Sequence, residues 1–215
     1  MEKTFLIGCG QHSDVVRYNM MAQGKYEPIG FIDNQKDCVG ETVRGLKILA
    51  DYETQDICKL IEKYGTNKFF ISFGNMKLRK TVFEKFVKAG FEPVNIIHPN
   101  AVIAPNAKIG KGVLIECGCL ITPNPVIGDN VVINTGSQVN HDNIVEDHVY
   151  IASGVILSGG VKIGENTLLD DGVIVTLGKS VGKNCIIGAG AIVTKNIPDN
   201  VIAYGTPAKV IRENG

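Results

Sequence analysis

The sequence predicts an α/β domain followed by a β-solenoid, on three observations. Residues 101–196 divide into sixteen consecutive hexapeptides with no insertion. The third residue of each hexapeptide is aliphatic, and the sixth is Gly or Asn in fourteen of them. Residues 1–98 instead alternate apolar runs typical of strands with segments of helical periodicity. We therefore predict two domains, residues 1–98 and residues 99–215.

The elements of the first domain alternate between strand and helix. KTFLIGCG predicts a strand that ends in glycines, DVVRYNMMAQ a helix and PIGFID a second strand. Further along, Thr54–Tyr64 has a helical pattern, KFFISFG is typical of a buried strand, Leu78–Ala89 has one apolar helical face, and EPVNII is a closing strand. This alternation indicates a small parallel sheet of Rossmann type.

The first turn of this domain is a candidate nucleotide site. The segment GCGQHS, residues 8–13, carries two of the three glycines of the dinucleotide fingerprint, with Ser13 in the third place. Asp33 follows at about the distance at which an acidic residue meets a ribose hydroxyl. The missing glycine disfavours NAD and leaves another nucleotide, or a sugar, as the ligand. The alternative is a glycine turn needed only for tight packing of strand against helix.

The period of six residues defines the second domain. An α-helix repeats its faces every 3.6 residues, whereas a short strand followed by a sharp corner repeats at six. Gly and Asn tolerate the positive φ of such a corner. Ile-Gly pairs recur at 18-residue spacing, so three hexapeptides form one coil of a three-sided prism. Asp142 and His148 are the two exceptions at the sixth position, and their adjacency predicts a functional site on this coil.

The second residue of each hexapeptide points outward, and on two faces it is mostly apolar. One face carries Leu114, Val132, Tyr150, Leu168 and Ile186; another carries Val102, Leu120, Gln138, Ile156, Ile174 and Ile192. Exposed apolar patches of this extent need a partner. A ring of three prisms, each touching two neighbours, would cover both faces, so we expect a homotrimer.

Composition excludes several classes of function. Lys plus Arg and Asp plus Glu number 22 each, so the chain lacks the basic excess of a nucleic-acid-binding protein. The six cysteines follow no metal-ligand spacing and lie mostly in apolar runs, which predicts reduced thiols, no metal site and a cytoplasmic location. With neither a signal peptide nor an apolar run of 18 residues, we expect no association with a membrane.

Six segments of the chain resemble a known family of enzymes. They are GCGQH, GFIDN, SFGNMKLRK, IIHPNAVIAPNAKIG, VNHDNIVEDHVYIASGVILSGGVKIG and AYGTPAKVI. The family is that of sugar acetyltransferases, which includes bacterial sialic acid O-acetyltransferases and N-acetyltransferases of nucleotide-linked 4-amino-sugars. The resemblance implies a Rossmann-like domain followed by a left-handed β-helix, a trimer, acetyl-CoA in the groove between adjacent prisms, and a nucleotide sugar on the N-terminal domain.

The resemblance also implies the catalytic residues. The family's base is a histidine in an [EN]-H-[DE] segment, here Asn140-His141-Asp142. A neutral imidazole can accept the proton of an attacking amine or hydroxyl, and the carboxylate of Asp142 would raise the basicity of His141 and fix its tautomer. Tyr150 departs from some N-acetylating relatives, which have there a second histidine bonded to the thioester carbonyl. A phenol can also donate to that oxygen.

The remaining site residues come from the same resemblance. Pantetheine contacts are implied at Gly159, Asp171 and Ala189. Eight residues of the N-terminal domain are implied around the nucleotide sugar: Gly10, Gln11, His12, Asp33, Asn34, Gly74, Asn75 and Arg79. Of these, His12 and Arg79 are candidates for contact with a phosphate or a base.

These features together predict an acetyl-CoA-dependent N-acetyltransferase that acts on a UDP-, dTDP- or GDP-linked 4-amino-dideoxy sugar. O-acetylation of a sialic-acid-type sugar is the alternative, which Tyr150 keeps open. A third hypothesis is a sugar-nucleotide-binding protein without catalytic activity. The intact His141–Asp142 pair argues against it.

Overall fold

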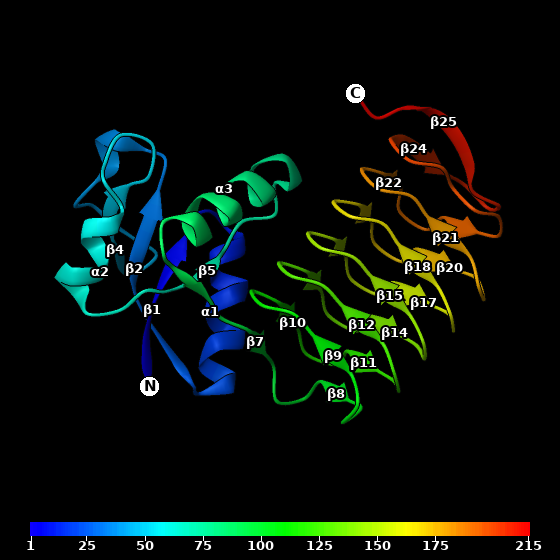
Figure 1. The fold of residues 1–215 in the computed structure, drawn as a ribbon, viewed down its shortest axis with the longest axis horizontal. Helices are drawn as coiled ribbons and strands as arrows, with labels where there is room; N and C mark the ends of the chain where they lie inside the picture. Colours follow the sequence, from blue (N-terminus) through cyan, green and yellow to red (C-terminus); the bar gives the residue numbers. More distant parts are fainter. The chain divides into compact units, whose positions relative to one another are not determined.

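The computed structural model describes all 215 residues and divides into two compact units, Met1–Ile96 and Ile97–Gly215 (Figure 1). The boundary lies two residues before the one expected from the sequence. The reason is the strand Ile96–Ile97 (β7), which joins a sheet of the second unit. The predicted closing strand EPVNII is therefore two strands, with Glu92–Pro93 (β6) in the first unit.

The first unit is built on a six-stranded sheet with the order β3-β4-β2-β1-β5-β6. Its other strands are β1 (Glu2–Ile7), β2 (Tyr26–Asp33), β3 (Thr42–Val43), β4 (Leu46–Asp51) and β5 (Lys68–Ile71). All neighbours are parallel except β3 and β4. That hairpin was not predicted, because its two-residue turn is Arg44-Gly45, with φ of 49° and 78°, and not one of the usual Asn-Gly or Asp-Gly pairs.

Three helices accompany the sheet: α1 (His12–Gln23), α2 (Cys58–Tyr64) and α3 (Met76–Lys88), with a short 3₁₀ turn at Lys36–Cys38. The predicted helix from Thr54 was wrong in its first turn. The carboxylate of Asp51 accepts hydrogen bonds from the Glu53 and Thr54 amides and from the Thr54 hydroxyl, which fixes a turn there. None of the helices combines the length and apolar composition needed to cross a membrane.

The second unit is a three-sided parallel β-helix. Each side is a sheet that we name by its first strand. The β7 sheet continues with β10 (Leu114–Ile115), β13 (Val132–Ile133), β16 (Tyr150–Ile151), β19 (Leu168–Leu169), β22 (Ile186–Ile187), β24 (Val201–Tyr204) and β25 (Lys209–Glu213). The β8 sheet comprises β8 (Val102–Ile103), β11 (Leu120–Ile121), β14 (Gln138–Val139), β17 (Ile156–Leu157), β20 (Ile174–Val175) and β23 (Ile192–Val193). The β9 sheet comprises β9 (Lys108–Ile109), β12 (Val126–Ile127), β15 (Ile144–Val145), β18 (Lys162–Ile163) and β21 (Ser180–Val181).

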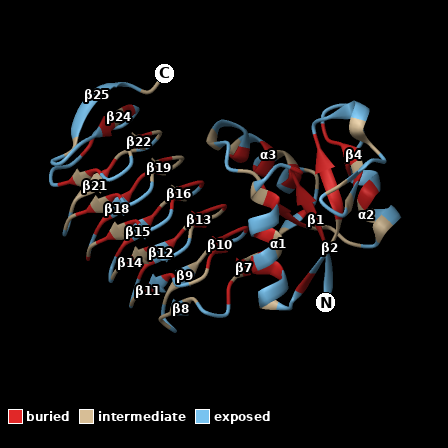
Figure 2. Ribbon diagram, turned by 180° about the vertical axis from the view of Figure 1, so that it is seen from behind, coloured by how far each residue is buried: buried red, intermediate tan, exposed pale blue.

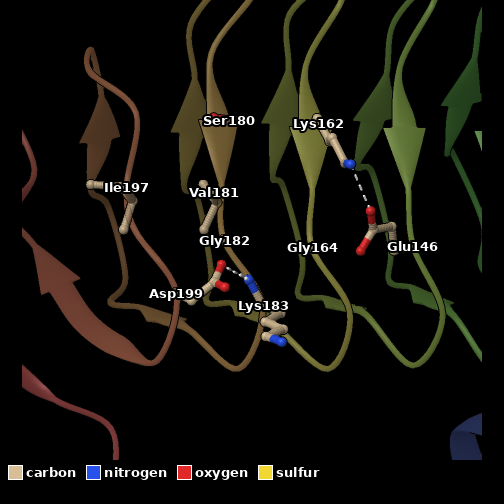
Figure 3. A pocket seen from close by; sticks show the side chains of 9 residues that line it. All are labelled: Glu146, Lys162, Gly164, Ser180, Val181, Gly182, Lys183, Ile197 and Asp199. Atoms are coloured by element: carbon tan, nitrogen blue, oxygen red, sulfur yellow. Dashed lines mark hydrogen bonds and ion pairs between the residues drawn. The ribbon is translucent and has the colours of Figure 1, made fainter.

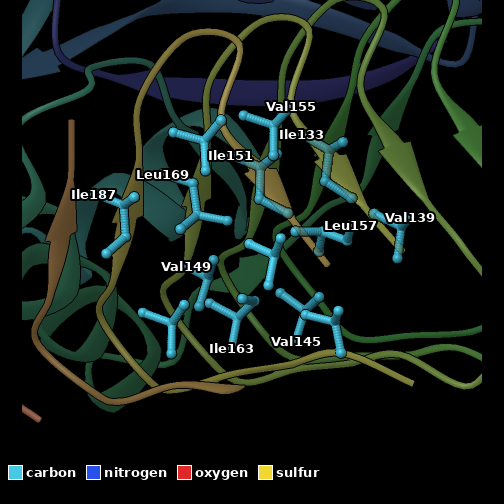
Figure 4. Close-up of a cluster of buried hydrophobic side chains, with 14 of the residues drawn as sticks. Ile133, Val139, Val145, Val149, Ile151, Val155, Leu157, Ile163, Leu169 and Ile187 are labelled. Atoms are coloured by element: carbon cyan, nitrogen blue, oxygen red, sulfur yellow. The ribbon is translucent and has the colours of Figure 1, made fainter. Parts of the chain in front are cut away.

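The predicted coil of 18 residues is confirmed by the strand register. Leu114 pairs with Val132, and Val132 pairs with Tyr150, in parallel along the β7 sheet. The aliphatic third positions point inward and fill the prism with a continuous buried column (Figure 4). Stacking of identical coils thus supplies the core that one coil could not bury alone.

Corners with positive φ occur at the sixth position of fourteen hexapeptides. Asp142 and His148 are among them, with φ of 60° and 62°, so both exceptions to the Gly or Asn rule adopt the regular corner. Asn106 and Asn196, in the first and last hexapeptides, do not.

The outer faces are less exposed than the sequence suggested (Figure 2). On the β7 sheet, Leu114 and Val132 are completely buried within the chain. On the β8 sheet, Val102 is 64% exposed and Leu120 39% exposed. On the β9 sheet, Val126 is 43% exposed and Ile144 44% exposed, so apolar surface left in water is not confined to the two faces expected from the sequence.

Candidate functional site

The three edges of the prism separate the candidate residues of the second unit. We name each edge by one corner residue. The His141 edge joins the β8 and β9 sheets, the His148 edge joins the β9 and β7 sheets, and the Gly154 edge joins the β7 and β8 sheets. Any two edges have a whole sheet between them, so the edge on which a residue lies decides what it can meet within one chain.

The His141–Asp142 pair is formed by the corner itself. Asp142 takes the left-handed conformation, and its Oδ2 lies 2.8 Å from Nδ1 of His141. A carboxylate can only accept at this contact, so Nδ1 carries the hydrogen and Nε2 of the neutral ring keeps a free electron pair. The side chains of His141 and Asp142 are 60% and 58% exposed, so the pair is accessible from solvent. The pair has the form of a general base with its orienting carboxylate.

Two hydrogen bonds keep Asp142 ionised. The bond from His141 is the larger cause that lowers the pKa of Asp142, and the bond from the Asn124 side chain is the second. Nδ2 of Asn124 donates to Oδ1 at 3.1 Å, so each carboxylate oxygen has its own donor. Near neutral pH the carboxylate is therefore an anion, ready to stabilise an imidazolium.

Gly159 lies on the same edge, one coil after His141. A Cβ built at this position would lie 2.3 Å from Nε2 of His141 and 2.4 Å from Cε1, far inside van der Waals contact. The backbone of Gly160 donates to the carbonyl of His141 at 2.9 Å, which fixes the register of the two coils. Glycine at 159 thus makes room for the imidazole, a function that the sequence did not suggest.

Tyr150, Asp171 and Ala189 lie elsewhere on the prism. Tyr150 belongs to the β7 sheet, the side opposite the His141 edge, and its hydroxyl accepts a hydrogen bond from Nδ2 of Asn134 at 3.2 Å. Asp171 and Ala189 lie on the Gly154 edge, where Oδ1 of Asp171 accepts from the Ser153 amide at 3.0 Å. Of the proposed pantetheine contacts, a single chain therefore brings only Gly159 together with His141.

A hollow of about 340 Å³ lies on the β9 sheet beside Glu146 (Figure 3). Glu146 stands where neighbouring coils have the glycine of an Ile-Gly pair. At Gly182 that glycine leaves room for Asp199, which accepts the Lys183 amide at 3.0 Å. The carboxylate of Glu146 accepts the corresponding amide of the next coil, since its Oε2 lies 3.0 Å from the Glu165 nitrogen. Its Oε1 lies 2.8 Å from Nζ of Lys162. This break in the repeat therefore has a structural cause.

The first unit has a pocket of about 180 Å³ at the carboxyl ends of its strands. Four of the eight predicted residues line it, namely Gly10, Asp33, Asn34 and Asn75; Gln11, His12, Gly74 and Arg79 do not. Five further residues line it that the sequence did not indicate: Gly8, Gln35, Tyr52, Phe73 and Leu78. Tyr52 follows the unpredicted strand β4, which is why no pattern pointed to it. Burial and the Asp33 carboxylate raise the pKa of Tyr52 to about 12, so its phenol remains a donor.

Asp33 and two glycines shape this pocket. Oδ2 of Asp33 accepts the Cys9 amide and Oδ1 the Asn34 amide, both at 2.8 Å, which ties the first turn to the end of β2. Gly8 has a φ of 99°, and a Cβ there would lie 2.5 Å from the Phe73 ring. At Gly10 a Cβ would meet nothing within 4 Å, so packing does not require glycine at this position. Space beside the backbone of Gly10 is thus open to a ligand.

Arg79 and His12 are not among the residues that line this pocket. Arg79 is 1% exposed, and its guanidinium donates to the carbonyls of Ile71 and Phe73, both at 3.1 Å. Arg79 therefore secures the loop between β5 and α3. Burial, followed by the positive charge of Arg79, lowers the pKa of His12 to about 4. At neutral pH His12 is uncharged and could contact a phosphate or a base only as a neutral group.

The low pKa of His12 predicts that acid destabilises the first unit. The folded pKa of about 4 lies below the ordinary value of 6.5, so between these values the unfolded chain binds a proton that the folded chain excludes. Stability should fall as pH drops from about 6.5 towards 4, by about 2 kcal/mol between pH 7 and pH 5. Calorimetric melts at pH 7 and pH 5 should show a smaller loss for His12→Asn than for the wild type. Equal losses would contradict the assignment.

The chain is similar to proteins of known structure over nearly its whole length. Residues 3–86 match the family described as the PglD N-terminal domain. A mutant perosamine N-acetyltransferase from Caulobacter crescentus, with one histidine replaced and in complex with CoA and GDP-perosamine, is 31% identical; the match covers 99% of this chain and 98% of that one, with a TM-score of 0.91. The acetyltransferase domain of PglB from Neisseria gonorrhoeae, in complex with acetyl coenzyme A, is 28% identical over 98% and 99%, with a TM-score of 0.85.

A curated relative also matches part of the chain. It is the GDP-perosamine N-acetyltransferase of Escherichia coli O157:H7, which is 32% identical over 77 residues. The match covers 36% of this chain and 33% of the relative, so it spans about a third of that protein's length.

Proposed function

Because the chain belongs to the hexapeptide-repeat family of nucleotide-4-amino-sugar N-acetyltransferases, we propose that it transfers the acetyl group of acetyl-CoA to the amine of a nucleotide-linked 4-amino-dideoxy sugar. The single observation that carries this proposal is the His141–Asp142 pair, whose 2.8 Å contact leaves Nε2 of an exposed histidine as proton acceptor. The Caulobacter enzyme, crystallised with one histidine replaced, contains both CoA and GDP-perosamine. A histidine that acts in chemistry and not in binding is compatible with that finding.

The proposed reaction uses His141 twice. The amine nitrogen attacks the thioester carbonyl carbon, a C–N bond forms, and Nε2 takes the proton that the nitrogen loses. The C–S bond then breaks, and the same proton passes to the departing sulfur, so the products are the N-acetyl sugar and CoA. While His141 is an imidazolium, the Asp142 carboxylate bonded to Nδ1 stabilises its charge.

We further propose that the working enzyme is a homotrimer in which each site needs two chains. The positions of the candidate residues support this arrangement. His141 and Gly159 lie on one edge of the prism, and Asp171 and Ala189 lie on another. One acetyl-CoA molecule could reach both edges only where two prisms meet. Tyr150 would then face the thioester carbonyl from the neighbouring chain. The apolar residues exposed on the β8 sheet, such as Val102 and Leu120, would be covered at the same contact.

Mixed trimers test the sharing of sites. His141→Ala removes the base, whereas Ala189→Glu would fill the groove and repel the phosphates of CoA, so each variant alone should be inactive. Co-expressed at equal levels, they should regain about a quarter of wild-type activity, because half the chains supply His141 and half of their neighbours supply Ala189. Light scattering should give the mass of three chains. No recovery in co-expressed protein that is trimeric would show that each chain holds a complete site.

The substrate is tested with a panel of acceptors. The names of the relatives favour a GDP-linked 4-amino-sugar, and the pocket with Gly10, Asp33 and Tyr52 is the proposed site for the nucleotide. We expect kcat/KM, measured by release of the CoA thiol, to be highest on a GDP-, UDP- or dTDP-4-amino-4,6-dideoxyhexose. Free and CMP-linked sialic acids are the matched alternatives. A tenfold preference for a sialic acid would reject N-acetylation and establish O-acetylation.

We assign the reaction to the cytoplasm. The six cysteines are all free thiols, and three of them are buried. Unpaired thiols persist in a reducing compartment.

A further inference from the structure

A ladder of polar side chains leads to Asp142 along the His141 edge. Asn106, Asn124 and Asp142 occupy the same corner of three successive coils. Nδ2 of Asn106 donates to Oδ1 of Asn124 at 2.6 Å, and Nδ2 of Asn124 donates to Oδ1 of Asp142 at 3.1 Å. The ladder therefore ends on the carboxylate that contacts His141.

A matching ladder on the His148 edge has no such end. Nδ2 of Asn166 donates to Oδ1 of Asn184 at 2.9 Å, and Nδ2 of Asn184 donates to Oδ1 of Asn200 at 3.0 Å. Asn124 and Asn184 are both sixth residues of hexapeptides, and both have positive φ, of 67° and 53°. The bonds of the two ladders therefore join corners with the same backbone conformation. Stacked asparagines by themselves thus only connect coils. What distinguishes Asn124 is that its acceptor is an ionised group beside the proposed base.

The two bonds to Asp142 define the orientation of its carboxylate. Oδ1 accepts from Asn124, and Oδ2 accepts from Nδ1 of His141. Asp142 is 58% exposed, so little packing restrains rotation of the carboxylate once the Asn124 bond is removed. We propose that Asn124 is a positioning residue for acetyl transfer, which holds Asp142 in the orientation that fixes the tautomer and direction of the His141 ring. This inference rests on the proposed function.

The kinetic test uses substitutions that keep the corner. Glycine is the regular residue at many corners of this prism, so Asn124→Gly removes the amide without straining the backbone. We expect kcat to fall about 3- to 10-fold, with KM for acetyl-CoA unchanged. The matched control is Asn184→Gly, which removes the same kind of rung from the other ladder and should lower Tm by a similar amount without changing kcat.

A double-mutant cycle separates positioning from general destabilisation. If Asn124 acts through Asp142, then Asn124→Gly should cause no further loss of kcat in the Asp142→Asn background. Equal and additive losses in both backgrounds would overturn the proposal, as would a fall in kcat for Asn184→Gly as large as that for Asn124→Gly.

Titration of the Asp142 carboxyl tests this inference without measuring activity, so its failure can be told apart from failure of the proposed function. The bond from Asn124 helps to hold the pKa of Asp142 below its ordinary range, and His141 is the titratable group next to the carboxylate. Carbon-13 NMR of the carboxyl groups should show a higher pKa for Asp142 in Asn124→Gly than in wild type, and no change in Asn184→Gly. An unchanged pKa would reject the link between Asn124 and Asp142, whatever the substrate panel shows.

Discussion

Replacement of His141 with alanine is expected to lower kcat about 10²- to 10⁴-fold, with acetyl-CoA binding close to that of the wild type. The reason is that Nε2 is the proposed proton acceptor of the reaction, while the side chain, 60% exposed, contributes little to the fold. Asp142→Asn should lower kcat less, because Asp142 orients and stabilises the ring and does not itself take the proton.

The measurement is steady-state kinetics with thiol release, combined with calorimetric titration of acetyl-CoA into each variant. Melting curves control for folding, since an exposed corner histidine should contribute little to Tm. More than about a tenth of wild-type activity in His141→Ala would mean that another group takes the proton, or that the amine arrives already deprotonated.

Gly159→Ala is expected to lower kcat at least about tenfold, although it adds only one methyl group. That methyl would lie 2.3 Å from Nε2 of His141, so the ring must leave its position. The backbone of Gly159 does not have the positive φ that would strain alanine, so folding should be retained. The expected loss thus comes from displacement of the base and not from the coil.

The control for this prediction is the same change made in the His141→Ala protein. With no imidazole to displace, Gly159→Ala should leave the residual activity unchanged. If the substitution instead raises KM for acetyl-CoA with kcat unaffected, then Gly159 is only a contact for pantetheine, as the family resemblance implied.

The period of the sequence predicted the second unit almost residue by residue. An aliphatic residue at the third position of each hexapeptide, and Gly or Asn at the sixth, determine strand, corner and coil length, because each coil repeats the same local backbone. The left hand of the β-helix was implied by the family resemblance and is borne out by the match over 99% of the chain. In the first unit, by contrast, the β3–β4 hairpin and the start of α2 depended on the particular hydrogen bonds and φ values of single turns.

The sequence by itself also determined the His141–Asp142 pair, because neighbours at a corner meet whatever the rest of the chain does. Only the tertiary structure decided which residues surround that pair. Gly159 and Asn124 lie 18 and 17 residues from His141 along the chain, and their contacts depend on where side chains point between stacked coils. Tyr150 lies nine residues from His141 but on the opposite side of the prism, since half a coil separates them. Arg79 is polar in sequence yet buried in the fold, because main-chain carbonyls satisfy its guanidinium.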